Sequence, residues 1–380
     1  MRITHISSFF WPVKGGMESH VQNLCNELVK SGNEVKVFTS DSARAGKAGK
    51  KDDSIDGVTV KRFPTWLKIS QFTPVFPGLL GQVIFDNSEI LHVHSYRQFH
   101  NLAIILGKLS GKKVVFTTHW PEYPESARNS LLNACIKIFD SVLGKFMLDS
   151  ADKIIAQVEL EKKWLAGKFN IPEGKIDVIP PGIPESYLAQ RNKNNFRKKF
   201  KIKERNIVLC VGRMHKSKGF DKIIKICKDF VNTKFVFAGP DGGFRNELEN
   251  LAKNLGVSDK VLFAGEISEE EKLEAYSGCD VFILPSDYEA FGLVLLEAMA
   301  QNAPVIAANA GGMPDVVGNC GFVFEKDNLA DLKEKLQRLL SDKKLRIRLG
   351  KLAKEKAREL TWKNQAQKVE RIYKSLLLEN

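Results

Sequence analysis

The first half of the chain alternates short apolar runs with helical patterns. Val21, Leu24 and Leu28 lie on one face of a predicted helix, and Gly32 follows where helices commonly end. The apolar runs predict strands at residues 3–7, 35–39, 58–61, 90–94, 114–118, 153–156 and 177–179. Strands that alternate with helices in this way are typical of a parallel sheet with helices on both faces.

The alternation stops at residues 191–205, which are rich in lysine and arginine, and then starts again. The second series predicts strands at residues 206–212, 234–238, 260–264, 280–284, 304–307 and 321–324. Helical patterns then run to the end of the chain. We therefore predict an α/β protein with two doubly wound, Rossmann-like domains, residues 1–185 and 186–362, followed by a C-terminal helix at residues 363–380.

The segment around Glu289 and Glu297 places two carboxylates across a predicted strand–loop–helix junction. Glu289 lies in the loop, and Glu297 lies about one turn into the helix. The helix start, where backbone N–H groups lack partners within the helix, supplies the amides of Phe291, Gly292 and Leu293. Such a corner can bind an anion with its amides and hydroxyl groups with its carboxylates. A sugar joined to a diphosphate offers both kinds of group.

Glycines and cations follow other predicted strands, at the edge where parallel sheets bind ligands. Gly15 and Gly16 follow the first strand and would let the backbone approach a phosphate, although an ordinary tight turn also explains them. Arg213 and Lys218 follow the first strand of the second domain. Their side chains can converge on one diphosphate, and the alternative is a solvated basic loop.

Histidines mark two neighbouring strand ends of the first domain. His92 and His94 lie on the same face of a strand, and this spacing fits a metal pair. No cysteine or acidic residue nearby in the sequence completes such a site, so we predict no metal. His119 ends the next strand, where a polar strand end is the plain alternative to a functional role. We expect His20 to be a helix-packing residue.

Together the motifs resemble those of retaining GT-B glycosyltransferases of family 4, the glycogen-synthase and mannosyltransferase type. The resemblance rests on Glu289, seven residues and then Glu297, with Phe-Gly-Leu between them. It also rests on segments that are similar to the family's G-G-x-x-x-H, H-x-H, T-x-H, G-R-x-x-x-x-K-G, V-I-P-N-G and G-G-x-P-E elements, in the family's order and over nearly the whole chain. The chain departs from the family pattern at Pro181, Pro184 and Asp315, which leaves acceptor-side detail open.

The resemblance implies a role for each motif residue. The Gly16 amide would face the donor diphosphate, the loop at Gly239 would surround the base, and Glu297 would bind ribose hydroxyls. Glu289 would bind the donor sugar, and Arg213 and Lys218 would stabilise the departing diphosphate. His119 would be a positioning and transition-state hydrogen-bond donor, with general base as the weaker alternative, and His94 would contact the acceptor. The family also implies a site in the cleft between the domains and a last helix that crosses back onto the first domain.

The amino-acid composition limits the class of protein and the kinds of binding partner that this chain can have. Hydrophobic residues make up 43% and charged residues 27% of 380 positions, as expected for a soluble globular protein. The net charge of +13 favours acidic partners, among them nucleotide sugars, anionic membranes and nucleic acid. The six cysteines are scattered and form no C-x-x-C pair, and no secretory signal is evident. These features predict a reduced, cytoplasmic protein with core cysteines.

We therefore expect a glycosyltransferase that moves a sugar from a UDP-, GDP- or ADP-linked donor to a hydroxyl of a glycan, lipid or small molecule. No D-x-D pair is evident, because Asp52 and Asp53 are expected in a polar loop, so the site is predicted to need no metal and no cofactor. A nucleotide-sugar epimerase or phosphorylase of the same fold is the enzymatic alternative. A basic nucleic-acid-binding protein is the other, although no zinc-finger or RNA-recognition motif supports specific nucleic-acid binding.

Two apolar stretches of the first domain bear on localisation. Residues 64–85 contain proline and glycine and are expected to form a mobile flap over the acceptor, suited to shallow docking of the enzyme on the anionic inner face of the cell membrane. Residues 130–148 form an apolar helical pattern that is expected to pack onto the core.

Overall fold

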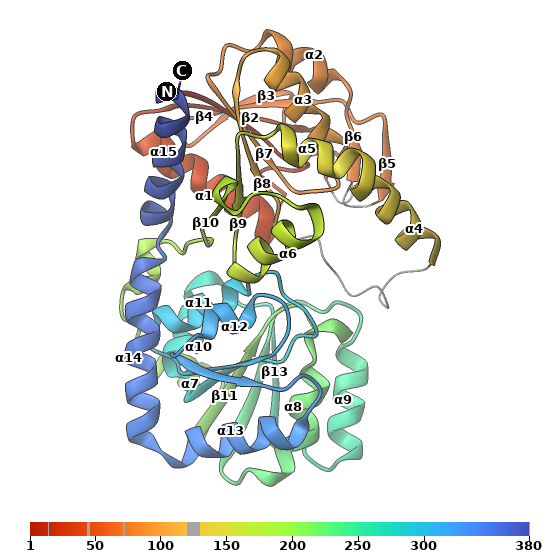
Figure 1. Cartoon of the computed structure of the whole chain (residues 1–380). Coiled ribbons are helices and arrows are strands. Elements are labelled where there is room, and N and C mark those ends of the chain that lie inside the picture. Colours follow the sequence, from red (N-terminus) through yellow and green to blue (C-terminus); the bar gives the residue numbers. More distant parts are fainter. Residues whose placement is uncertain (14, 44–45, 71–72, 120–129, 380) are drawn as a thin grey trace. The chain divides into compact units, whose positions relative to one another are not determined.

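The structure is a computed structural model that describes residues 1–13, 15–43, 46–70, 73–119 and 130–379. Contacts divide the chain into two units (Figure 1). Unit 1 comprises Met1–Gly182 and Trp362–Asn380, and unit 2 comprises Ile183–Thr361. The predicted α/β class is confirmed, because each unit is built on a parallel sheet with helices packed against it.

Unit 1 contains an eight-stranded sheet with the order β10-β9-β8-β7-β1-β2-β4-β3. Its strands are β1 (Arg2–Ile6), β2 (Glu34–Ser40), β3 (Asp52–Ile55), β4 (Val58–Phe63), β7 (Ile90–His94), β8 (Lys113–Thr117), β9 (Lys153–Ala156) and β10 (Ile176–Val178). Neighbouring strands are parallel except for β3, which pairs antiparallel with β4. The chain winds outward in one direction through β2 and in the other through β7, so the switch point of the sheet lies between β1 and β7.

Both faces of this sheet are covered, because successive strand residues point to opposite sides. Ile3 packs with α1 and α15 in one apolar cluster, whereas Ile6 packs with α2, α3, α5 and α6 in the other. Figure 1 shows α15 beside α1, as their contacts confirm. The helices of unit 1 are α1 (Gly16–Lys30), α2 (Gly78–Phe85), α3 (Leu102–Leu109), α4 (Ser130–Phe139), α5 (Lys145–Ser150), α6 (Glu159–Phe169) and α15 (Trp362–Leu378).

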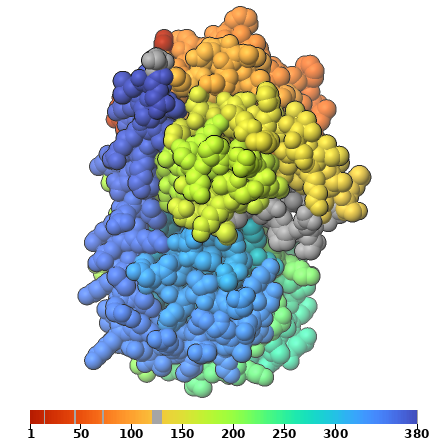
Figure 2. All heavy atoms as spheres, viewed as in Figure 1, coloured from red at the N-terminus to blue at the C-terminus, as the bar shows by residue number. Residues whose placement is uncertain are grey.

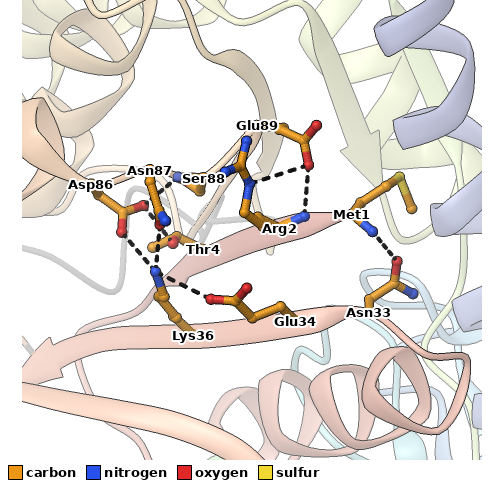
Figure 3. Close-up of polar contacts among 10 residues, drawn as sticks. All are labelled: Met1, Arg2, Thr4, Asn33, Glu34, Lys36, Asp86, Asn87, Ser88 and Glu89. Carbon is orange, nitrogen blue, oxygen red and sulfur yellow. Dashed lines mark hydrogen bonds and ion pairs between the residues drawn. The ribbon is translucent and has the colours of Figure 1, made fainter.

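A polar network joins the amino ends of β1, β2 and β7 (Figure 3). The carboxylate of the buried Asp86 accepts hydrogen bonds from Thr4 Oγ1 at 2.8 Å and from Lys36 Nζ at 3.4 Å. Burial alone would raise the pKa of Asp86, but hydrogen bonds from Ser88 and Thr4 and the charge of Lys36 hold the pKa below its usual value. The network stabilises the edge of the sheet opposite to the one where ligands are expected.

Unit 2 contains a six-stranded, all-parallel sheet with the order β13-β12-β11-β14-β15-β16. The strands are β11 (Asn206–Val211), β12 (Thr233–Ala238), β13 (Val261–Gly265), β14 (Val281–Leu284), β15 (Val305–Ala308) and β16 (Gly321–Phe324). The helices are α7 (Asn195–Lys199), α8 (Phe220–Ile226), α9 (Arg245–Asn254), α10 (Glu269–Gly278), α11 (Leu293–Ala300), α12 (Met313–Val317), α13 (Leu329–Ser341) and α14 (Lys343–Glu359). The switch point lies between β11 and β14, the two central strands.

The expectations for the two apolar stretches of unit 1 were each wrong in part. Residues 64–85 form β5 (Leu67–Ser70) paired with β6 (Thr73–Val75) and then α2, and Phe76 and Leu79 are completely buried, so the second half of the stretch packs into the core. Residues 71–72 of that stretch lie outside the described residues. In residues 130–148, which were expected to pack, the helix α4 has no buried residue, whereas Met147 and Leu148 of α5 are buried in the core as expected. Asp52 and Asp53 were expected in a loop but begin β3.

Candidate active site

The loops that follow β11 and β14 meet at the switch point of unit 2. Lys218 from the first loop forms an ion pair and hydrogen bond with Oε1 of Glu289 from the second. The hydroxyl of Ser286, which is buried, donates to the same carboxylate oxygen at 2.8 Å. Two predicted catalytic residues, 71 positions apart in sequence, are thus brought into direct contact.

Glycine makes the close approach of these two loops possible. Gly219 has a φ of 67°, and a Cβ placed there would lie 2.2 Å from the carbonyl oxygen of Pro285. Beside it, the amide of Asp287 donates to the carbonyl of Ser217 at 2.9 Å. A side chain at position 219 would therefore separate Lys218 from Glu289.

A third loop, after β12, packs on the other side of the β11 loop. Gly239 has a φ of 139°, and a Cβ there would lie 2.2 Å from the carbonyl oxygen of Gly212. The amide of Met214 donates to the carbonyl of Pro240 at 2.9 Å. Arg213 lies between these contacts with an exposed side chain, and it has no hydrogen bond or ion pair among the described residues. Its guanidinium is therefore open to an anionic ligand.

The turn at Gly311 and Gly312, just before α12, supports the backbone of Glu289. Gly311 has a φ of 58°, and a Cβ there would lie 2.0 Å from the carbonyl oxygen of Glu289. The same carbonyl accepts a hydrogen bond from the amide of Gly312 at 2.9 Å. This turn therefore fixes the position of the Glu289 loop.

Glu297 lies on α11 in a pocket of polar groups. Its Oε2 accepts from the hydroxyl of Tyr276 at 2.9 Å and pairs with Lys272 Nζ at 3.1 Å, both from α10. Burial raises the pKa of Glu297 above its usual value, although the charge of Lys272 and the Tyr276 hydrogen bond act in the opposite direction. These two partners of Glu297 could not be foreseen from the sequence.

The start of α11 lies between the two carboxylates. Gly292 caps the helix with a φ of 89°, Phe291 before it is 5% exposed, and Leu293 is the first helical residue. The predicted helix start is confirmed, and the binding of an anion by its amides stays a prediction.

In unit 1 the predicted glycine turn also opens a helix. Gly16 is the first residue of α1, is exposed, and has no atom within 4 Å of the position where a Cβ would lie. Its φ is outside the left-handed region, so the backbone there does not demand glycine. The open space around Gly16 is compatible with a ligand close to its amide.

The structure gathers five of the chain's seven histidines into one cluster in unit 1, the members being His5, His20, His92, His94 and His119. His5 on β1 lies opposite His92 on β7 in the parallel register, and His94 lies opposite Thr117 on β8. His20 enters from α1 and packs edge-on against the Trp362 ring of α15, with 4.9 Å between the ring centres. The expected packing role of His20 agrees with this contact.

The cluster is held in the uncharged state by burial. Desolvation lowers the pKa of His5 and of His119 to about 3, and it also lowers the pKa values of the other three members well below the usual value. Neutral imidazoles are the metal-binding form, and two groups can offer three ligand atoms within 4.8 Å of one another: His5, His92 and His94, or His20, His94 and His119. The sequence argument against a metal missed His5, which comes from a strand remote in sequence.

Ring geometry and hydrogen bonds count against the first of these triads. The rings of His92 and His94 are stacked with centres 4.2 Å apart, so their nitrogen lone pairs run side by side and do not converge on one ion. His92 also has both ring nitrogens bonded, Nδ1 to the Tyr373 hydroxyl at 2.5 Å and Nε2 to Thr117 Oγ1 at 2.7 Å. In the second triad two of the ring nitrogens are bonded to each other, because His94 Nδ1 is hydrogen-bonded to His119 Nε2 at 3.2 Å.

His94 and His119 differ in how far they are exposed to solvent. His94 is fully buried, with its two ring nitrogens bonded to His5 and His119. His119 is partly exposed and has a φ of 53°, a strained conformation for a residue with a side chain and one that is common at functional sites. The acceptor contact of His94 and the donor contact of His119 remain predictions.

Two sequence profiles match the chain. The profile described as "Glycosyltransferase Family 4" matches residues 14–187, and that described as "Glycosyl transferases group 1" matches residues 192–356. An uncharacterised glycosyltransferase of Methanocaldococcus jannaschii is 29% identical, with 98% of each chain covered. The gpi3 subunit of phosphatidylinositol N-acetylglucosaminyltransferase of Schizosaccharomyces pombe is 26% identical, over 99% of this chain and 81% of that one.

Solved structures show the same fold. The Anabaena protein HepE in complex with UDP superposes with a TM-score of 0.78 at 16% identity, over 99% of this chain and 100% of that one. The two Rossmann-like sheets and this likeness define a GT-B protein. The chain belongs to the group 1 glycosyltransferases of family 4, and it is accordingly an enzyme that transfers sugars.

Proposed function

We propose that this enzyme transfers a sugar from a nucleoside diphosphate to an acceptor hydroxyl, with retention of anomeric configuration and without a metal ion. The observation that carries the proposal is the contact between Lys218 and Glu289 at the switch point of unit 2, with the unpaired Arg213 on the same loop. A diphosphate sugar needs cations for its phosphates and a carboxylate for its hydroxyl groups, and these loops present both.

The main chemical task is to stabilise the negative charge that develops on the departing diphosphate. Arg213 offers a planar fork of N–H donors, and the ammonium of Lys218 has three, so Lys218 can keep its bond to Glu289 and still donate to a phosphate oxygen. The amides of Phe291, Gly292 and Leu293 would bind the same anion from the start of α11. With these groups the charge is neutralised by the protein itself.

The carboxylates and the glycine loops would hold the remainder of the donor. Glu297 would accept the ribose hydroxyls, and its bonds to Tyr276 and Lys272 fix the orientation of its carboxylate. Glu289 would bind sugar hydroxyls, and the Gly239 loop would surround the base. On unit 1, the Gly16 amide would contact the diphosphate and His119 the sugar. Because we identify no candidate for a carboxylate nucleophile among the described residues, we favour displacement on the same face of the sugar, assisted by the substrate.

A thermal-shift screen with UDP-, GDP- and ADP-sugars tests the donor class, because a ligand that binds only the folded state raises the melting temperature. UDP-sugars belong in the panel because HepE was solved with UDP. We expect the sugars of one of these three nucleoside diphosphates to raise the melting temperature, both with and without EDTA. A shift that appears only with added Mn²⁺ or Mg²⁺ would contradict metal-independent binding. Incubation of the donor alone separates an epimerase, which needs no acceptor, from a transferase.

We further propose a lipid-linked acceptor, reached by peripheral contact with the anionic inner face of the cell membrane. The continuous helical segment from α4 to α5 presents Leu131, Ile138, Val142 and Phe146 to solvent, each more than half exposed. Figure 2 shows α4, in yellow, at the surface of unit 1. Within the described residues no helix combines the length and apolarity needed to cross a bilayer. The phosphatidylinositol glycosyltransferase subunit among the relatives supports a lipid acceptor.

A further inference from the structure

Three imidazoles of unit 1 form a hydrogen-bonded row that ends on an amide. His5 Nδ1 lies 3.0 Å from His94 Nε2, and His94 Nδ1 lies 3.2 Å from His119 Nε2. The remaining ring nitrogen of His119, Nδ1, lies 3.0 Å from Nε2 of Gln157. The same Gln157 nitrogen lies 3.4 Å from Nδ1 of His20 on α1. Gln157 therefore contacts both the helix that follows the Gly16 turn and the ring of His119.

Gln157 is itself fixed by a buried carboxylate. It follows β9 directly, is 5% exposed, and its backbone amide donates to Oε2 of Glu161 at 2.6 Å. Glu161 is completely buried in the first turn of α6, and its other oxygen accepts from the hydroxyl of Thr118, the residue before His119. Both ends of the Gln157–His119 contact are thus anchored to one carboxylate.

The amide nitrogen at the end of the row fixes the position of every proton along it. An amide nitrogen only donates, so Nδ1 of His119 accepts and its proton resides on Nε2. That proton is donated to His94 Nδ1, so the proton of His94 resides on Nε2 and is donated to His5 Nδ1. His5 then carries its proton on Nε2, which is buried and has no partner among the described residues.

We propose that Gln157 is a positioning residue for sugar transfer, which holds His119 as the Nε2–H tautomer and aligns it with α1. The proposal rests on the donor-sugar role given to His119 above. With this tautomer, His119 has its proton on Nε2, and in the row this proton is donated to His94 Nδ1. A sugar hydroxyl would accept the proton in place of His94, and the other tautomer would have no proton to donate from Nε2.

The decisive variant is Gln157→Glu, because a carboxylate of nearly the same shape only accepts. His119 must then donate from Nδ1, and its Nε2 becomes an acceptor. We expect long-range ¹H–¹⁵N spectra of protein with ¹⁵N-labelled histidine to show His119 as Nε2–H in the wild type and as Nδ1–H in Gln157→Glu. We expect kcat to fall at least about tenfold, with the KM for the donor little changed, as for a group that acts in the transition state.

Gln82→Glu is the matched control, because it makes the same exchange on α2, where the side chain accepts from Lys61 Nζ. It should keep the wild-type spectrum and kcat. Gln157→Ala is the second variant: it removes the donor without adding charge and should give a mixture of His119 tautomers. The proposal is overturned if wild-type His119 is the Nδ1–H form, or if its tautomer is the same in all variants.

The spectra need no turnover, so this test is separate from that of the enzyme's function. Wild-type activity in His119→Ala would contradict the role proposed for His119 in transfer, whatever the tautomer. A wild-type kcat in Gln157→Glu, together with a changed tautomer and an inactive His119→Ala, would show that the tautomer does not matter for transfer and would also overturn the positioning role.

Discussion

Lys218 and Glu289 are bonded to one another although they follow different strands of unit 2, β11 and β14. In the proposed function, Lys218 binds the diphosphate and Glu289 binds the sugar, so this contact would lie beside the bond that joins the diphosphate to the sugar in the donor. The glycine contacts at Gly219 and Gly311 hold the two loops in this position.

Loss of the diphosphate cations is expected to slow the chemical step. Arg213→Ala and Lys218→Ala should each lower kcat by on the order of a hundredfold, about 2.7 kcal/mol of transition-state stabilisation. Steady-state kinetics would measure the effect, and Lys216→Ala is the control, since it removes an exposed cation from the same loop. A rise in KM with unchanged kcat would mean that both residues bind the ground state and the transition state equally.

The two glutamates are expected to differ in their kinetic effects. Glu297→Ala should weaken donor binding and raise the KM for the donor, because it removes the proposed contact with the ribose. Glu289→Ala should lower kcat more, because its proposed role places Glu289 beside the sugar and it contacts Lys218. Melting temperatures are needed alongside, since Glu297→Ala also deprives Tyr276 and Lys272 of a partner. Wild-type kinetics in either variant would exclude that residue from the site.

The histidine cluster is expected to make unit 1 sensitive to acid. The unfolded chain binds a proton at each histidine below a pKa of about 6.5, whereas folded His5 and His119 stay neutral down to a pKa of about 3. The unfolded state therefore binds more protons in this range, and stability falls as the pH drops from about 6.5 to 3. Each such histidine should lower the free energy of unfolding by about 1.4 kcal/mol at pH 5.5, compared with neutral pH.

Urea unfolding at pH 7.5 and 5.5 measures this loss. His5→Asn should lose less stability between the two pH values than the wild type, because one buried neutral histidine is gone. His215→Asn is the control, since His215 is exposed on unit 2 and should leave the loss unchanged. Equal losses of stability in all three proteins would contradict the conclusion that the buried, neutral His5 makes unit 1 sensitive to acid.

Membrane contact is expected to depend on the exposed apolar residues of the segment from α4 to α5. The protein should sediment with anionic vesicles at low salt. Less of it should sediment as the salt concentration rises, because salt screens the attraction between the basic protein and the anionic lipids. Ile138→Ser with Phe146→Ser should reduce sedimentation. Val231→Ser, at an even more exposed apolar position on unit 2, should not. If the protein stays in the supernatant with anionic and neutral vesicles alike, a soluble acceptor becomes the better hypothesis.

Much of the fold could be predicted because its signals are local. The strands at residues 90–94, 153–156 and 321–324 agree with the structure to the residue, and the last helix agrees to within two residues at each end. Buried parallel strands are continuous apolar runs, which stand out between amphipathic helices. The β5–β6 hairpin and α2 were missed because their proline and glycine content suggested an unpacked segment, yet Phe76 and Leu79 are anchored in the core.

The motifs at the strand ends could be recognised from the chain alone. Glu289, Arg213, Lys218 and His119 follow apolar runs that had to be buried strands, Glu297 lies in the helix after one of them, and the order of the motifs indicated the family. Which of these residues touch depends on the fold of each whole unit. The Lys218–Glu289 bond depends on the adjacency of β11 and β14, and the row from His5 to Gln157 depends on the adjacency of β1, β7, β8 and β9. Strand adjacency is set by packing over the whole sheet and leaves no mark in the local pattern of residues. His5 could have been foreseen from the doubly wound strand order, which places the first strand beside the fourth in the series, but the proton positions required the contact with Gln157.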